Sequence, residues 1–148
     1  MEIAILGLGC FWGPERKFGE IEGVTKTEVG YCGGMSKETS YQEVCTGTTG
    51  HAEVVKIEFD ESIISYEVII NLFFDFHDPT TLNRQGPDIG NQYRSEIFYA
   101  NESQEKIAEK VLENRNLDFK GKIVTKISEI LNYCKAEEYH QKYLMKNL

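Results

Sequence analysis

The sequence predicts a single-domain, two-layer α/β (α+β) fold in which helices cover a central sheet. Short apolar runs of period two interleave with amphipathic runs of period 3.6, which is typical of strands and helices packed in layers. The chain has 148 residues, the size of one domain, so we assign residues 1–148 to a single domain. Its composition, 41% hydrophobic and 27% charged, is that of an ordinary globular protein.

The first half of the chain begins with an apolar run over 2–8, which predicts a buried strand. Pro14 suits the first turn of a helix, where its missing N–H leaves no partner unsatisfied, so we expect a helix over 14–20. Cys10 then lies at or just before the start of that helix. A strand over 24–29, a glycine-rich loop over 30–34 and a second strand over 52–59 follow.

Two capped helices are predicted in the second half. Ser65 precedes a helix whose inward residues recur with helical spacing: Ile69, Leu72, Phe73 and Phe76. Asn101, with Gln104 three residues later, resembles a capping box and begins another helix. The remaining predictions are an irregular segment over 77–92, strands over 95–100 and 123–130, and a final helix over 134–146.

Charge and cysteine content exclude several function classes. The 16 basic and 24 acidic residues give a net charge of −8, and no basic run is present to bind nucleic acid or an anionic membrane. No apolar stretch approaches ~18 residues and no signal peptide is evident, so we expect a cytoplasmic protein. The four cysteines form no C-x-x-C pair, which argues against a metal site. We expect a monomer without a bound cofactor.

Glu53 is the first candidate for chemistry. In a strand over 52–59 it shares the apolar face with Val55 and Ile57. Burial on that face raises the pKa of a carboxyl group, and a carboxylic acid of raised pKa can donate a proton near neutral pH. The alternative is a solvated carboxylate at the exposed end of the strand.

Cys10 is the second candidate. It lies in the segment 9–13, which begins and ends with glycine, and the start of a helix lowers a thiol pKa. The alternative is a small buried hydrophobic residue. Tyr41 and Tyr93 are either hydrogen-bond donors or packed rings. His51 is either a base or ligand, or a structural histidine.

The motifs together resemble the peptide methionine sulfoxide reductase A family. Gly9-Cys10-Phe11-Trp12-Gly13 matches its signature pentapeptide. Further matching blocks follow in family order and cover nearly the whole chain: VGYCGG at 29–34, YQEVCTG at 41–47, TGHAE at 49–53, ISYE at 64–67, HDP at 77–79, RQG at 84–86, Asp88, QYRS at 92–95 and AEEYHQ at 136–141. The resemblance implies a mixed central sheet related to the ferredoxin-like arrangement.

The resemblance also implies a reaction, the thiol-dependent reduction of methionine S-sulfoxide, free or in proteins. By resemblance Cys10 is the nucleophile that attacks sulfur, and Glu53 protonates the sulfoxide oxygen. Tyr41 and Tyr93 donate hydrogen bonds to that oxygen. The substrate-binding positions that the family implies are an apolar wall for the S-methyl group and two supporting residues: Phe11, Trp12, Asp88 and His51.

The cysteines leave the regeneration of Cys10 open. In many relatives a glycine-rich C-terminal tail carries resolving cysteines, and we expect no such tail here. An external thiol, glutathione or glutaredoxin, can attack the Cys10 sulfenic acid directly. Alternatively, Cys32 or Cys134 resolves it and thioredoxin is the donor, provided that the Cα atoms come within ~7 Å. We interpret Cys45 as structural.

Two rival functions share some of these residues. A thiol peroxidase or redox sensor also needs a reactive Cys10, but it has no use for the aromatic residues and the carboxyl group around it. A non-catalytic binding module needs no thiol, so it is insensitive to Cys10→Ser.

Overall fold

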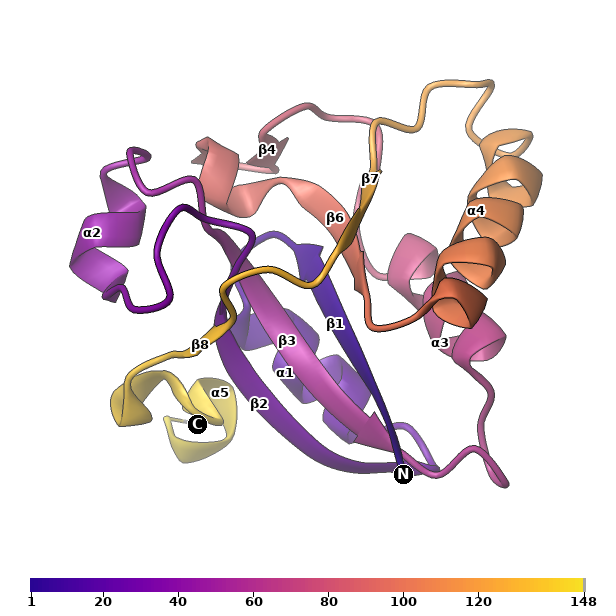
Figure 1. The fold of residues 1–148 in the computed structure, drawn as a ribbon, viewed down its shortest axis with the longest axis horizontal. Helices are drawn as coiled ribbons and strands as arrows, with labels where there is room; N and C mark the ends of the chain where they lie inside the picture. Colours follow the sequence, from indigo (N-terminus) through magenta and orange to yellow (C-terminus); the bar gives the residue numbers. More distant parts are fainter. Residues whose placement is uncertain (148) are drawn as a thin grey trace.

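A six-stranded sheet lies at the centre of the computed structural model, which describes residues 1–147 (Figure 1). The strand order is β7-β6-β1-β3-β2-β8. All neighbouring pairs are antiparallel except β6 with β7, so the predicted mixed sheet is confirmed. The strands are β1 (Glu2–Leu8), β2 (Val24–Cys32), β3 (Ala52–Phe59), β6 (Ser95–Tyr99), β7 (Lys126–Glu129) and β8 (Cys134–Lys135), with a separate hairpin of β4 (Arg84–Gln85) and β5 (Asp88–Ile89).

The helices differ in length and position. The α-helices are α1 (Trp12–Gly19), α2 (Tyr41–Cys45), α3 (Tyr66–Asp75), α4 (Glu102–Asn116) and α5 (Tyr143–Lys146), and the 3₁₀ turns are η1 (Asn91–Tyr93) and η2 (Glu138–His140). Both predicted caps are present, because Ser65 accepts the N–H of Val68 and Asn101 accepts the N–H of Gln104. Within residues 1–147 the structure contains no helix with the length and apolar character needed to cross a membrane.

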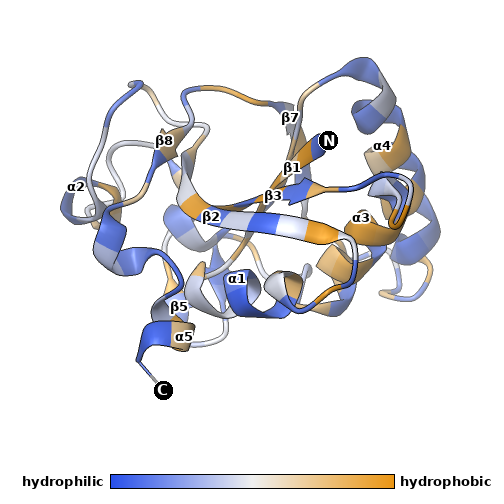
Figure 2. Cartoon of the chain, turned by 90° about the horizontal axis from the view of Figure 1, so that it is seen from below, coloured by the Kyte–Doolittle hydropathy of each residue, from blue (hydrophilic) through white to orange (hydrophobic). Residues whose placement is uncertain are grey.

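The main core lies between one face of the sheet and the helices α1, α3 and α4. Strand residues such as Leu6, Ile57 and Ile97 pack there against Phe18 of α1 and Phe73 of α3. Figure 2 shows α3 mostly in the hydrophobic colour, in keeping with its burial. The two-layer α/β fold class that we predicted is confirmed.

The opposite face of the sheet is covered by the chain between β7 and β8, which crosses the sheet in Figure 1. Ile130 and Tyr133 from this crossing pack on a second, smaller cluster that includes Ile5 and Phe98. Because successive strand residues face opposite sides, Val54 joins this second cluster and Val55 joins the main core.

Several predicted boundaries were wrong. Strand β2 continues to Cys32 through much of the expected glycine-rich loop, because β3 and β8 both pair with it there. The strand predicted over 123–130 is limited to Lys126–Glu129. Helix α1 begins at Trp12, earlier than expected, and Pro14 lies in its first turn.

The helix predicted over 134–146 was also wrong. This segment forms β8, η2 and the one-turn helix α5. The edge of β2 accounts for the difference, since Ala136 N–H donates to Val29 O and the Gln141 side chain bonds both backbone groups of Val29. Hydrogen bonds to a distant strand therefore replace those of a helix. Lys142, with φ 53°, then turns the chain into α5.

Candidate functional site

Glu53 lies at the start of β3, on the helix-covered face of the sheet. It is 1% exposed, so the alternative of a solvated carboxylate is wrong. Its Oε1 accepts the N–H of Phe11 at 3.2 Å, and its Oε2 is buried without a hydrogen-bond partner among residues 1–147. Burial raises the pKa of Glu53 to about 8, which outweighs the opposing effect of the Phe11 bond. The carboxyl group is therefore mainly protonated at neutral pH.

Cys10 lies between β1 and α1 and is partly exposed. Gly9 precedes it with φ 96°, and a Cβ at this glycine would lie 2.8 Å from Gln85 Cγ. Glycine thus allows the β4–β5 hairpin to approach Cys10. Our expectation of a lowered thiol pKa was wrong: burial raises it to about 11, although a backbone hydrogen bond from Trp12 opposes the rise.

Tyr41, Tyr93 and Asp88 converge on the same place. The charge of Glu53 raises the pKa values of both tyrosines, after the larger effect of burial, and the pKa of Tyr93 reaches about 12. The charge of Asp88 contributes to the raised pKa values of Cys10 and Glu53. Both hydroxyl groups therefore keep their protons and can donate hydrogen bonds.

Phe11 and Trp12 take different places. The Phe11 ring is 1% exposed and packs against Tyr31 and His140, with centroid distances of 5.8 and 5.2 Å. Trp12 is partly exposed and stacks on Tyr143 at 3.8 Å with an interplanar angle of 10°. Its indole N–H donates to His140 Nδ1 at 3.1 Å. Trp12 thus offers the accessible apolar surface, and Phe11 supports it from below.

The C-terminal segment contributes residues that sequence reasoning missed. In the helix that we predicted over 134–146, Glu137 and His140 had no assigned role in the site. Glu137 instead accepts the Tyr31 hydroxyl at 2.7 Å and the Tyr41 N–H at 2.9 Å. The sequence signal for this role was the AEEYHQ block at 136–141. We missed it because we predicted a continuous helix there, whereas the chain turns back toward the site.

His51 does not reach the surface of the site. Its ring is fully buried, and its Nε2 atom lies 2.9 Å from the carbonyl oxygen of Ser36. It therefore supports the loop before α2.

Arg94 ties together the loops that carry the site. Its guanidinium donates to the carbonyl oxygens of Asn91 and Gly50, both at 2.9 Å. It also pairs with buried Glu96 at 2.6 Å, and Ser128 donates to the other oxygen of Glu96. These contacts link the turn that holds Tyr93 to the loop that leads into β3.

The other cysteines differ in their relation to Cys10. Cys32 is fully buried in the cluster on the opposite face of the sheet. Cys134 pairs with Tyr31, which in turn pairs with Glu53, so the Tyr31 side chain separates Cys134 from the site. The Cys32 thiol therefore faces away from Cys10, whereas Cys134 lies on the same face of the sheet as Glu53. Cys45, which we interpreted as structural, is exposed, and its charge contributes to the raised pKa values of Tyr41 and Cys10.

Comparison with known proteins decides the family. The family model described as peptide methionine sulfoxide reductase matches residues 2–148. The chain belongs to this family. A relative named peptide methionine sulfoxide reductase MsrA, from Pelagibacter ubique, is 66% identical over 146 residues, which is 99% of each chain.

Solved structures agree with this assignment. The reduced form of Mxr1 from Saccharomyces cerevisiae matches with a TM-score of 0.95 and 38% identity, over 99% of this chain and 85% of the yeast chain. Mxr1 in complex with Trx2 matches with a TM-score of 0.69 and 24% identity, over 96% and 84% of the two chains, which supports the fold alone. As a member of the family, the protein is an oxidoreductase that reduces methionine sulfoxide by thiol chemistry, with no prosthetic cofactor.

Proposed function

We propose that Cys10 attacks the sulfoxide sulfur while Glu53 protonates the sulfoxide oxygen. The observation that carries this assignment is the Oε2 atom of Glu53, which is buried, without a partner among residues 1–147, and on a carboxyl group that is neutral at pH 7. Glu53 accepts a hydrogen bond from the backbone N–H of Phe11, the residue that follows Cys10. This bond holds the carboxyl group beside the nucleophile. A sulfoxide oxygen is a strong hydrogen-bond acceptor and can receive the proton of the unpaired Oε2–H group.

The raised pKa values set the order of proton transfer. Both groups keep their protons in the free enzyme at pH 7, since the pKa of Cys10 is about 11 and that of Glu53 about 8. As the Glu53 proton moves to the oxygen, the new carboxylate accepts the thiol proton. The Cys10 sulfur first bonds to the sulfoxide sulfur. The protonated oxygen then passes to the Cys10 sulfur, so a new S–O bond forms while the S–S bond and the original S–O bond break, and one electron pair returns to the methionine sulfur. The sulfoxide is reduced to methionine, the thiol is oxidised to a sulfenic acid, and Glu53 ends protonated.

Tyr41 and Tyr93 supply hydrogen bonds to the same oxygen, which supports polarisation of the S–O bond. Trp12 supplies the accessible wall for the S-methyl group, with Phe11 beneath it. With the oxygen at Glu53 and the methyl group at Trp12, the two epimers differ in where the rest of the methionine side chain leaves the site, which gives a basis for the S selectivity that the resemblance implies. Asp88 favours the protonated form of Glu53 through its negative charge.

An external thiol of the glutathione or glutaredoxin class then reduces the sulfenic acid. Cys32 lies in the cluster on the opposite face of the sheet, and Tyr31 stands between Cys134 and Glu53, which favours direct attack over an internal disulfide with either residue. A thioredoxin is the alternative donor, supported by the yeast relative solved in complex with Trx2. Four free thiols fit a reducing cytoplasm, and we expect a monomer.

A single-turnover experiment tests this proposal. Reduced enzyme is mixed with a peptide methionine S-sulfoxide without reductant, and methionine, free thiols and intact mass are measured. We expect about one methionine and a mass gain of ~16 Da per enzyme, with no methionine from Cys10→Ser. No methionine from the unmodified enzyme, or undiminished methionine from Cys10→Ser, would overturn the assignment. Loss of a second thiol would indicate an internal disulfide, and peptide mapping would identify its cysteine.

A further inference from the structure

Four consecutive residues fasten the C-terminal segment to the body of the protein. We call residues 140–143 the strap. His140 accepts the indole N–H of Trp12, and Gln141 bonds the backbone of Val29 on β2. Lys142 binds α1 and β2, and Tyr143 stacks on Trp12. Two of the four strap residues therefore contact Trp12, and the other two anchor the strap.

Glu15 of α1 forms the anchor for Lys142, although the mechanism above makes no use of it. Its side chain is fully buried. Oε1 accepts the N–H of Lys142 at 2.6 Å, and Oε2 accepts the Thr27 hydroxyl at 2.9 Å. The ammonium group of Lys142 lies 3.9 Å from Oε2 and donates to Thr27 O at 3.2 Å. A buried carboxylate is costly unless it is bonded in this way, so its position is closely defined.

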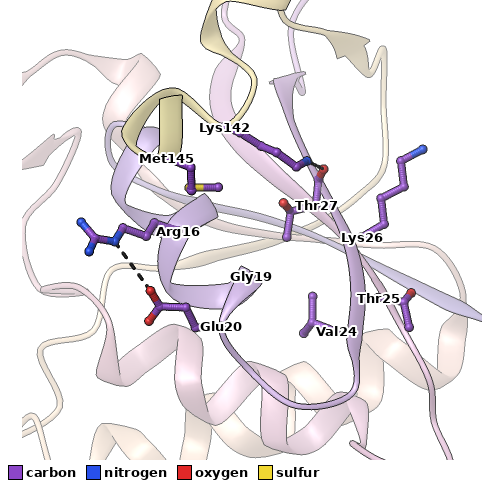
Figure 3. Close-up of a pocket in the computed structure, with 9 residues that line it drawn as sticks. All are labelled: Arg16, Gly19, Glu20, Val24, Thr25, Lys26, Thr27, Lys142 and Met145. Atoms are coloured by element: carbon purple, nitrogen blue, oxygen red, sulfur yellow. Dashed lines mark hydrogen bonds and ion pairs between the residues drawn. The ribbon is translucent and has the colours of Figure 1, made fainter. Parts of the chain in front are cut away.

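Apolar packing does little to hold the strap on this side. A cavity of about 290 Å³ lies between α1, β2 and α5, and the Lys142 side chain passes along it to Thr27 (Figure 3). Arg16 and Glu20 pair with each other at the α1 side of this cavity and leave the strap unbound. Besides the contacts of Trp12 at the start of α1, the polar contacts of Glu15 therefore link the strap to α1.

The spacing of residues couples the Glu15–Lys142 hydrogen bond to the stacking of Tyr143 on Trp12. Glu15 and Trp12 stand three residues apart on α1, so they are neighbours on the helix surface. Lys142 and Tyr143 are adjacent on the strap, and Lys142 takes a left-handed conformation with φ 53°. When Glu15 fixes the backbone of Lys142, the next side chain lies flat on the indole of Trp12.

We propose that Glu15 is a positioning residue that holds Tyr143 against Trp12 and thereby sets the wall that receives the S-methyl group of the substrate. This inference rests on the proposed function for the role of Trp12. Glu15 touches neither the substrate nor Cys10, so its effect is on substrate affinity and on the environment of the indole. The chemical step at Cys10 and Glu53 is unaffected.

The test uses Glu15→Gln, with Glu20→Gln as the matched control. Both remove one negative charge from α1 or its end, but Glu20 is exposed and, among residues 1–147, forms an ion pair with Arg16 alone. Trp12 is the only tryptophan in the chain, so fluorescence excited at wavelengths that tyrosine does not absorb reports on its environment alone. We expect Glu15→Gln to raise KM about fivefold with kcat within about twofold, and to shift the Trp12 emission to longer wavelength. Glu20→Gln should change neither.

Tyr143→Ala provides a second variant that leaves Glu15 intact and removes the stacked ring. It should reproduce the rise in KM and the emission shift, and the double variant should add little to either. Unchanged KM and emission in folded Glu15→Gln, or additive effects in the double variant, would overturn the proposal. The emission change does not require activity. A failed single-turnover reaction would therefore overturn the proposed function while the emission still tests the link between Glu15 and Trp12.

Discussion

The backbone N–H of Phe11 donates a 3.2 Å hydrogen bond to one oxygen of Glu53, and the other oxygen, Oε2, lies buried without a partner among residues 1–147. This bond joins the loop of the nucleophile to the strand of the acid. It also orients the carboxyl group so that its free oxygen is left for the substrate. The relationship requires β1 and β3 to be neighbours, which their antiparallel pairing provides.

The first prediction concerns the pH dependence of catalysis. The mechanism needs Glu53 protonated, and its pKa is about 8. We expect kcat/KM for a methionine S-sulfoxide to be level below pH ~8 and to fall about tenfold per pH unit above it. Glu53→Gln should lower kcat/KM by about 10²-fold or more and remove this inflection. An inflection that persists in Glu53→Gln would assign the titration to another group.

The second prediction concerns stability. Burial in the fold raises the pKa of Glu53 from its ordinary value of 4.5 to about 8, so the native state keeps a proton that the unfolded chain releases. The stability that this proton confers is present at low pH and is lost as pH rises toward 8. Urea unfolding should show Glu53→Gln gaining stability relative to the unmodified protein between pH 5 and 8. A constant difference across that range would show that Glu53 is ionised in the fold.

The third prediction concerns the two tyrosines. Removing either hydroxyl takes away one donor to the sulfoxide oxygen, so Tyr93→Phe and Tyr41→Phe should each lower kcat/KM by about tenfold or more. Tyr99→Phe, on β6, is the control and should have no effect. Steady-state kinetics on all three variants decide the matter. If Tyr93→Phe behaved like Tyr99→Phe, Tyr93 would have no part in polarising the oxygen.

The fourth prediction separates the remaining cysteines. Cys32 faces the far side of the sheet, and Cys134 lies behind Tyr31. Serine at either position should leave the number of thiols lost per turnover unchanged. Cys45 is the remaining thiol near the site, so Cys45→Ser belongs in the same thiol titration. A smaller thiol loss in Cys32→Ser or Cys134→Ser would restore that residue as a resolving cysteine.

Local sequence patterns predicted much of the fold. The period-two run at 52–59 and the capping residues Ser65 and Asn101 each predicted an element that the structure contains. They succeeded because the forces that form these elements act between residues close in sequence. The alternation of β3 also placed Glu53 on the correct face.

Long-range contacts explain the errors. The segment after Cys134 has helical composition, but its Gln141 side chain binds the edge of β2. The N–H of the next residue, Lys142, donates to the Glu15 side chain. The pKa of Cys10 was misjudged for a similar reason. The helix start was visible in the sequence, whereas the burial that outweighs it depends on the β4–β5 hairpin and the neighbouring loops.

The protonation state of Glu53 is the most direct test of the mechanism. Carbon NMR of ¹³C-carboxyl-labelled glutamate can follow this group through a pH titration, with the Glu53→Gln variant assigning the signal. The structure predicts a midpoint near pH 8, so that the acid is still protonated at neutral pH. A midpoint near the ordinary value for glutamate, 4.5, would contradict the proposal that Glu53 donates the proton to the sulfoxide oxygen.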